Sequence, residues 1–414
     1  MRGLIHHSAL QAAAIALVAV LAGTSAAHAG DAPVLERWRS YSGVSWDNKA
    51  AAAGRTPARF ANSVNAPIAG LHFDTRGRAF VSTPRLVSAD APATLSILDT
   101  TATSGPARLT AFPSQAANAV AGPVGEALRN VLGFYVDRHN QWLWALDMGF
   151  VAGEKMSPEG AQKLLVIDLR TGRTVKAIAL DGVADRSGSF LNDVAVDERR
   201  KVAYIADSGM RSAPDNQVGL IVVDFASGQA RRVLDRHSSL QIEPGVKVVS
   251  HGEEVWPGNP LLLGVNGVAL SPDGQTLYWT VTTGTRLRAV PTALLRDAGA
   301  SDAMCAAAIR DLGAVGGNTD GIVADAAGRV YITDVTRNGI VRYEPATGTL
   351  ALLAADEGVQ WPDTPAIGPG GALYFTSSHL NHHFAGAVKA GDERYELWRL
   401  PLKQARDARA RTSP

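Results

Sequence analysis

The sequence predicts an all-β protein, a six-bladed β-propeller with four-stranded blades. The main evidence is a phrase that occurs six times: an apolar run, a tight turn and a strand rich in aromatic and β-branched residues, at residues 69–81, 132–145, 192–206, 266–279, 320–332 and 363–375. Repeats of roughly forty to seventy residues that are built on β-hairpins are typical of propellers. Each copy therefore predicts the two inner strands of one blade.

Further hairpins follow several of these copies and predict outer strands. Pairs of apolar segments flank the turns at Gly172, Gly228 and Gly348, which is the pattern of a β-hairpin. Inner and outer hairpins together give about twenty-four strands in one continuous domain. Residues 292–297 and 301–309 predict short helical segments.

The two ends of the predicted propeller are expected to meet, or at least to lie in neighbouring blades. Residues 34–38 and 395–400 each have the composition of a short strand. Pairing a strand from one terminus with a blade built from the other removes the open edge of the ring. Residues 403–414 form a polar tail with basic residues that we expect to fray.

The first residues are expected to be a targeting segment. Arg2 precedes an apolar stretch at residues 9–22, and an Ala-x-Ala pattern follows at residues 27–29, as in secretory signal peptides. We therefore assign residues 1–29 to a signal peptide, 30–402 to the propeller and 403–414 to a flexible tail. The mature protein is expected to be periplasmic or secreted, with an uncleaved anchor as the alternative.

Charge and cysteine content narrow the classes of partner. The net charge of +1 gives no electrostatic reason to expect nucleic acid, or a membrane after signal cleavage. The single cysteine, Cys305, cannot form an internal disulfide and is expected to be a packed thiol. Three longer insertions, at residues 114–129, 149–162 and 237–260, are rich in Gly, Pro and polar residues. Such loops on a rigid ring commonly shape a binding face, so the expected partner is a small-molecule ligand or substrate.

The first position of the repeated phrase predicts a site. In a propeller the innermost strands line the central channel, so the aligned residues are expected to form a ring: Ala69, Leu132, Asn192, Asn266, Asp320 and Asp363. Four consecutive blades then contribute amide or carboxylate oxygens. Hard cations such as Ca²⁺ prefer these ligands, whereas metals that favour thiolate or imidazole do not. The alternative is structural, since Asn and Asp often cap loops, and Asn-Gly and Asp-Gly are common turn dipeptides.

Three histidines form a second candidate cluster beside the last blade. His379, His382 and His383 have a spacing that would suit a transition metal if the segment were helical. We expect instead a loop at the channel mouth, in which a histidine contacts substrate or transfers a proton. Asp147 and Asp207 follow inner strands and are expected to hold turns.

Several segments resemble the major royal jelly protein/Yellow family. They include residues 78–85 (RAFVSTPR) with 91–95 (APATL), 190–194 (FLNDV) with 203–209 (AYIADSG), and 360–364 (QWPDT). The resemblance runs from about residue 70 to about residue 400 and implies a six-bladed propeller. Insect members include secreted nutritive proteins, pigment-pathway proteins with dopachrome-converting activity and binders of biogenic amines. This chain departs from them in having no paired cysteines.

The inner-strand motifs also resemble those of SMP-30/gluconolactonase-like propellers. Asn192-Asp, Asn266-Gly and Asp320-Gly are similar to the metal-binding pattern of that group, which adds a Glu on the first blade where this chain has Ala69. The resemblance implies that Asn192, Asn266 and Asp320 hold a metal, and we expect Asp363 to supply the missing charge. A metal polarises a ring carbonyl while a carboxylate activates water, so Asp193, Asp320 or Asp363 would be the base.

The resulting hypothesis is an exported propeller that carries out metal-assisted hydrolysis of a lactone or similar ester at the channel mouth. A non-catalytic binder of small aromatic or amine ligands is the first alternative. A dopachrome-type isomerase is the second. The sequence leaves open whether the protein is an enzyme at all.

Overall fold

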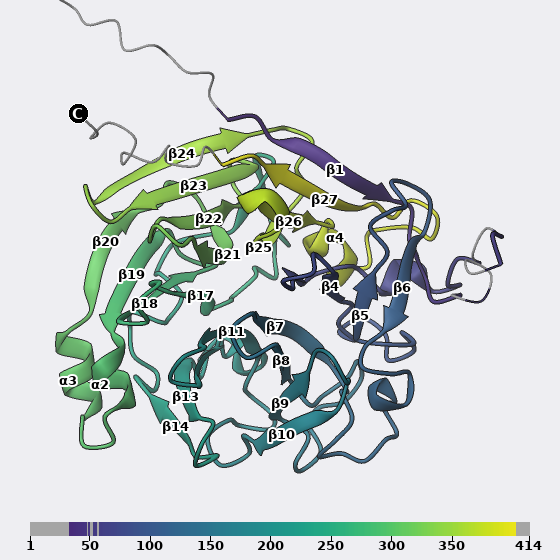
Figure 1. Cartoon of the computed structure of the whole chain (residues 1–414). Helices are drawn as coiled ribbons and strands as arrows, with labels where there is room; N and C mark the ends of the chain where they lie inside the picture. The colour runs from purple at the N-terminus through teal and green to yellow at the C-terminus, as the bar shows by residue number, and fades with distance from the viewer. Residues whose placement is uncertain (1–32, 48, 50–52, 56–57, 403–414) are drawn as a thin grey trace, which may run out of the picture. The chain divides into compact units, whose positions relative to one another are not determined.

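The computed structural model describes residues 33–402 except 48, 50–52 and 56–57. The predicted signal peptide and tail lie outside these residues. The described residues form six β-sheets arranged as blades around a common axis (Figure 1), which confirms the predicted propeller. Among them no helix is long and apolar enough to cross a membrane.

The innermost strand of each blade lies nearest the axis. These strands are β3 (Leu71–Phe73), β7 (Val131–Asp137), β11 (Leu191–Asp197), β17 (Val265–Leu270), β21 (Thr319–Ala324) and β25 (Pro362–Ile367). Second strands pair antiparallel with them: β4 (Ala79–Ser82), β8 (Trp142–Asp147), β12 (Val202–Asp207), β18 (Thr276–Val281), β22 (Val330–Asp334) and β26 (Leu373–Ser377).

The outer strands complete the blades. Third strands are β5 (Leu95–Leu98), β9 (Lys163–Asp168), β13 (Gly219–Asp224), β19 (Arg286–Pro291), β23 (Gly339–Glu344) and β27 (Tyr395–Leu400). Fourth strands are β6 (Ala107–Ala111), β10 (Thr174–Ala179), β14 (Ala230–Val233), β20 (Arg310–Ala314), β24 (Thr349–Ala355) and β1 (Glu36–Tyr41). The first blade gains a fifth strand, because β2 (Val44–Ser45) pairs parallel with β6.

The ring closes as the sequence predicts. The N-terminal strand β1 pairs antiparallel with the C-terminal strand β27, with Glu36 opposite Arg399 and Tyr41 opposite Tyr395. The two strands lie side by side at the rim (Figure 1). This pairing covers the edge of the last blade, which would otherwise present unpaired backbone groups to solvent.

The core lies between neighbouring blades. Trp279 and Tyr204, both fully buried, belong to one cluster that joins the third and fourth blades, and Trp144 packs in a cluster built largely on the second and third blades. Aromatic side chains of this size remove large apolar areas from water. The inner and middle strands are therefore held in a fixed relation to the axis.

Short helices lie between strands. They are α2 (Thr292–Arg296), α3 (Asp302–Ala307) and α4 (Leu380–Phe384), with 3-10 turns η1 (Ser63–Asn65), η2 (Ala116–Asn118), η3 (Met210–Ser212) and η4 (Pro369–Gly371). Helices α2 and α3 were expected, and Cys305 in α3 is buried as predicted. The segment expected as a loop at residues 380–384 is instead the helix α4.

The insertion at residues 237–260, which we call the strap, crosses one end of the ring. It leaves the third blade and carries the small hairpin β15 (Val249–Ser250) and β16 (Glu253–Glu254). The amide of Val249 donates to Asn318 Oδ1 at 3.0 Å, and Trp256 Nε1 donates to the carbonyl of Asn381 at 2.9 Å. The strap thus contacts the connections that enter the fifth blade and leave the second strand of the sixth.

The two ends of the ring therefore differ. All three long insertions connect strands at the end where the inner strands begin, which we call the insertion face. The opposite end carries the short turns between first and second strands, and we call it the hairpin-turn face. The hairpin-turn face also carries one longer connection, between β19 and β20, which contains α2 and α3.

Candidate functional site

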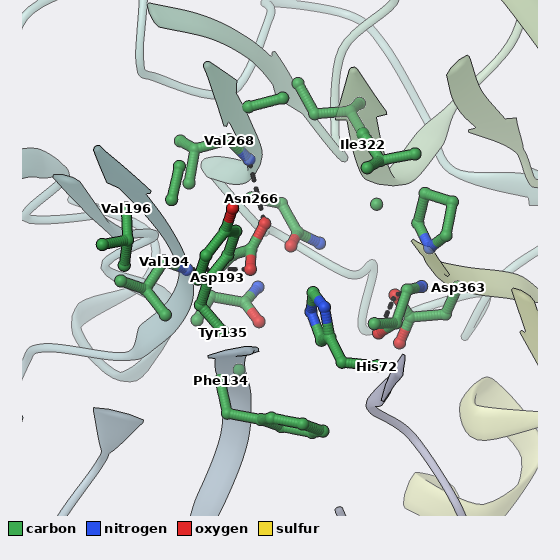
Figure 2. Close-up of a pocket in the computed structure, with 18 of the residues that line it drawn as sticks. His72, Phe134, Tyr135, Asp193, Val194, Val196, Asn266, Val268, Ile322 and Asp363 are labelled. Carbon is green, nitrogen blue, oxygen red and sulfur yellow. Dashed lines mark hydrogen bonds between the residues drawn. The ribbon is translucent and has the colours of Figure 1, made fainter. Parts of the chain in front are cut away.

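A cavity of about 110 Å³ lies along the axis and is lined by inner strands of all six blades (Figure 2). At its insertion end the lining is polar and includes Asn192, Asn266 and Asp363. Further along the axis it becomes aromatic and aliphatic, with Phe134, Tyr135, Val194, Val196, Val268 and Ile322. A cavity of this size can hold several waters or the functional group of a small ligand.

A shared irregularity turns the polar residues toward the axis. Strands β7, β11, β17 and β21 each shift register around the first positions of the phrase, between Val131 and Phe134 in β7, and β25 shifts one residue later, between Asp363 and Ala366. A β-bulge of this kind inserts an extra residue and re-aims the side chains beside it. The first positions of the repeated phrase therefore coincide with a β-bulge as well as with the beginning of an inner strand.

Glycine follows the axial position in four copies because the next blade approaches closely. A Cβ on Gly133 would lie 2.2 Å from the carbonyl oxygen of Asn192, and one on Gly321 would lie 2.5 Å from Pro365 Cδ. Both distances are shorter than real Cβ contacts, so no larger residue fits without a backbone shift. The Asn-Gly and Asp-Gly pairs are therefore sites of close blade approach, and not the tight turns considered as the structural alternative.

Asn266 and Asp320 are held together. Asn266 Nδ2 donates to Thr282 Oγ1 at 2.7 Å and also to Asp320 Oδ1, while Trp361 Nε1 donates to Asp320 Oδ2 at 2.6 Å. Both oxygens of Asp320 are thus engaged, and the carbonyl oxygen of Asn266 remains toward the cavity. Burial raises the pKa of Asp320 to about 7, against the lowering effect of its two donors.

Asp193 occupies the second position of the phrase, where most copies have glycine. Its Oδ2 accepts from the amide of Val268 at 3.0 Å, and its Oδ1 accepts from the amide of Val194 at 2.8 Å. The carboxylate thereby links the third and fourth blades. Burial raises its pKa to about 6 despite these two backbone donors.

Asp363 has a free oxygen. Its Oδ1 accepts from the amide of Thr364 at 2.5 Å and from Thr364 Oγ1 at 3.2 Å, and among the described residues no group donates to its Oδ2. Burial and then the charge of Asp320 raise the pKa of Asp363 well above its usual range. Asn192 also lines the cavity, and no side chain or backbone group of the described chain forms a hydrogen bond with the amide group of its side chain.

The three carboxyl groups have no basic partner. No lysine or arginine of the described chain forms a hydrogen bond or ion pair with Asp193, Asp320 or Asp363, and burial is the main cause of each raised pKa. An ionised carboxylate in such a place is unfavourable unless a positive charge pairs with it, and a carboxyl group without such a partner binds a proton instead. The site therefore favours either bound protons or a bound cation.

His72 is the site residue that sequence reasoning missed. It points into the cavity beside Asp363 (Figure 2), and its ring packs on Phe134 at 5.1 Å and on Tyr135 at 5.8 Å between centroids. Burial and then the charge of Arg138 lower its pKa to about 3, so its imidazole is neutral. A signal was present: the fourth position of the phrase is polar only in the first two copies, as His72 and Tyr135.

The predicted ring is only partly realised. Leu132, Asn192, Asn266 and Asp363 line the cavity, and Asp320 joins them through Asn266. Ala69 does not line it: this residue is fully buried, and its carbonyl accepts from Thr376 Oγ1 at 2.7 Å. The first blade contributes His72 instead.

The three histidines of the last blade lie elsewhere. His379, His382 and His383 are at or in α4 on the insertion face, and none of them lines the axial cavity. His383 Nδ1 lies 2.7 Å from the carbonyl of Val64, and burial lowers the pKa of His379 and His383 to about 4. The expected substrate contact of these histidines is therefore not made at the axial cavity.

The residues at the axis supply only part of the ligand set of a calcium ion as they are arranged. The described residues contain no group of three or more His, Cys, Asp or Glu placed to hold a metal ion. Calcium takes six to eight oxygen ligands, whereas both oxygens of Asp320 accept from Asn266 and Trp361. A metal ion would therefore have to use the remaining lone pairs of these oxygens and take further oxygen ligands from Asn192, Asn266 and Asp363.

Asp147 and Asp207 hold turns, as the sequence predicts. Asp147 accepts from the amides of Arg129, Asn130 and Gly149 at 2.7–3.0 Å. Asp207 accepts from the amides of Phe190 and Gly209 at 2.9 and 3.2 Å. These carboxylates fix the loops of the insertion face and lie outside the axial cavity.

Comparison with known proteins supports the sequence resemblance to the major royal jelly protein/Yellow family. Residues 130–410 match the family model described as "Major royal jelly protein", and no curated protein matches the chain in sequence. Similar solved structures include a gluconolactonase from Xanthomonas campestris, at 16% identity and TM-score 0.47 over 81% of this chain and 86% of that one. A calcium-binding protein, regucalcin, from Agrobacterium tumefaciens has 18% identity and TM-score 0.48 over 81% and 91%. A luciferin-regenerating enzyme has 11% identity and TM-score 0.46 over 81% and 91%.

Proposed function

Because the chain belongs to the major royal jelly protein family, and because its axial carboxyl groups lack a basic partner, we propose that its cavity binds a small organic cation, an aromatic amine. The observation that carries this proposal is the burial of Asp193, Asp320 and Asp363 with no lysine or arginine bound to them. An ammonium group would provide the missing positive charge.

The open acceptors match the donors of a primary ammonium. Three residues that line the cavity each have one side-chain oxygen without a donor in the described chain: Asn192, Asn266 and Asp363, the last through its Oδ2. A primary ammonium carries three N–H donors. Hydrogen bonds to charged groups are each worth more than neutral ones, so an amine is favoured over an alcohol of the same shape.

The rest of the cavity suits an aromatic body. The rings of His72, Phe134 and Tyr135 lie beside one another, and Val268 and Ile322 face them across the cavity (Figure 2). Aromatic rings pack edge-to-face or offset at these separations. A ligand with an ammonium at one end and a ring at the other would place each part against its matching surface.

Metal-assisted hydrolysis of a lactone is the second candidate. The gathering of Asn192, Asn266, Asp320 and Asp363 at one level of the axis favours it. A divalent ion there would polarise a carbonyl, and Asp193 or Asp363 would act as the base. A dopachrome-type isomerase stays a prediction.

We also propose that the protein acts in the periplasm or outside the cell. The support is the apolar stretch at residues 9–22 with the Ala-x-Ala pattern at 27–29. The net charge of +1 supports a small molecule as its partner, rather than nucleic acid or a membrane surface.

Calorimetry with a matched pair of ligands tests the amine proposal. Phenethylamine and 2-phenylethanol have the same ring and chain and differ only in the polar group. We expect saturable binding of the amine and weaker binding of the alcohol. The variant Asp363→Asn should weaken amine binding by roughly 10- to 100-fold, the value of one hydrogen bond to a charged group.

The matched control is Asp356→Asn, because Asp356 is an exposed acid of the sixth blade's entry loop. Its affinity for phenethylamine should equal that of the wild type. Equal affinity for the amine and the alcohol would overturn the proposal. Binding of Ca²⁺ together with lactone turnover that Asp320→Ala abolishes would favour the hydrolase instead.

A further inference from the structure

The insertion end of the axial cavity is covered. Asn192, Asn266 and Asp363, which line this end, are only 6%, 4% and 9% exposed. At this end lies a hydrophobic cluster that contains Ala69 and Trp361 together with two strap residues, Val248 and Val255. No residue of the strap lines the cavity, so this apolar layer separates the polar ring from the insertion face.

The opposite end continues into a second cavity. The axial cavity shares Tyr135, Val196, Leu270 and Ala324 with a cavity of about 400 Å³ on the hairpin-turn face. That second cavity is lined by His139 and by the turn residues 197–199, 271–274 and 325–326. Three of the residues that line both cavities, Tyr135, Leu270 and Ala324, are partly exposed.

We propose that ligand reaches the axial site through the hairpin-turn face, and that Tyr135, held by Glu198, is the residue that sets the width of this entrance. The nature of the ligand rests on the function proposed above. The route itself rests on the two cavities and on the covered insertion end.

Tyr135 stands at the junction because it lines both cavities. Its hydroxyl donates to Glu198 Oε1 at 3.0 Å, and burial keeps the pKa of this hydroxyl well above its usual range, so it remains a donor. On the cavity side its ring contacts His72 at 5.8 Å between centroids.

Glu198 is itself fixed to the neighbouring turn. It belongs to the turn after β11, and it accepts from the amides of Arg138 at 3.3 Å and His139 at 2.8 Å in the turn after β7. Its carbonyl also accepts from Asn140 Nδ2 at 2.7 Å. The two turns thus hold the Tyr135 ring in one place at the entrance.

Modification of His72 by diethyl pyrocarbonate tests the route without any ligand. His72 has a neutral imidazole inside the axial cavity and no hydrogen-bond partner among the described residues. Its rate of carbethoxylation, measured by peptide mass spectrometry, therefore reports how a small electrophile reaches the cavity. Two variants place a polyethylene-glycol maleimide on opposite faces: Ala326→Cys on the hairpin-turn face and Glu253→Cys on the strap.

Both label positions are exposed, and the native Cys305 is buried. We expect the label on Ala326→Cys to slow His72 modification several-fold relative to the unlabelled variant. The label on Glu253→Cys should leave the rate unchanged. The reverse pattern, or equal rates for all four proteins, would overturn the proposed route whether or not an amine binds.

Variants at the junction test the role of Tyr135. Tyr135→Ala should speed His72 modification several-fold, whereas Tyr135→Phe, which keeps the ring, should speed it less. Glu198→Ala should speed it as well, because the ring loses its anchor; this variant keeps the test decisive if Tyr135→Ala does not fold. No change in Tyr135→Ala and Glu198→Ala would overturn the assignment of Tyr135. The two proposals can be separated. If phenethylamine binds but the labels and the Tyr135 variants leave the rate of His72 modification unchanged, only the proposed route is overturned. If phenethylamine fails to bind while the labels act as expected, only the amine proposal is overturned.

Discussion

The contribution of Asp193 to the stability of the ligand-free protein should become unfavourable as the pH rises, and a variant at this position allows the effect to be isolated. Burial raises its pKa in the folded protein to about 6, above the ordinary value of 3.8 for an aspartate side chain. At pH values below the unfolded pKa the group is protonated in both states and has no effect. Between the two pKa values the unfolded state loses its proton first, so folding becomes progressively less favourable, and above about pH 6 the loss is complete.

The magnitude follows from the size of the shift. About two pKa units correspond to about 3 kcal/mol of unfolding free energy, since each unit is worth about 1.36 kcal/mol. The variant Asp193→Asn cannot titrate. It loses one acceptor for a backbone amide, but that loss is the same at every pH. The difference in unfolding free energy between variant and wild type should therefore move by about 3 kcal/mol in favour of the variant between pH 4 and pH 7.

Denaturant unfolding followed by tryptophan fluorescence at several pH values measures this difference. Asp168→Asn is the control of opposite sign, because hydrogen bonds to Arg170 and Thr171 lower the pKa of Asp168 to about 2. Its wild-type carboxylate stabilises the fold above the unfolded pKa and loses that effect as the pH falls toward 2. A pH-independent difference for Asp193→Asn would refute the reasoning, because it would mean that water reaches this end of the axis freely.

Three further outcomes are expected. Trp361→Phe removes the donor to Asp320 Oδ2 and should lower the unfolding free energy by about 1.5–3 kcal/mol at neutral pH, the value of a hydrogen bond to a charged group; an unchanged denaturation midpoint would contradict this. Gly133→Ala places a Cβ 2.2 Å from a backbone oxygen of the next blade and should destabilise by about 1–3 kcal/mol, whereas Gly125→Ala, with nothing within 4 Å, should be close to neutral in the same assay. His72 should remain neutral at pH 5, as ¹⁵N chemical shifts of its ring would show; a cationic ring at that pH would contradict the burial that lowers its pKa to about 3.

The fold could be predicted from the sequence because each blade carries the same local signals. The recurring inner hairpin, the Gly-containing outer turns and the two terminal strands all appear in the structure. The helix α4 was missed because it is only five residues long and follows a left-handed His379, a conformation that the sequence pattern does not reveal.

The site could be predicted only in part. The alignment of the repeats placed Asn192, Asn266 and Asp363 near one level of the axis, since five of the six inner strands bulge at or next to this position. It could not show that Trp361 and Asn266 occupy the oxygens of Asp320. It also could not show that the strap covers the insertion end, because that depends on contacts between segments far apart in the chain.

Proton release on binding tests the central claim most directly. If an ammonium pairs with acids whose pKa values are raised by burial, binding must lower those pKa values and expel bound protons. Titrating phenethylamine at pH 6.5 in buffers of different ionisation enthalpy measures this number. We expect about one proton to be released per bound phenethylamine, and we expect this number to be smaller for Asp363→Asn. Binding without any proton exchange would contradict it.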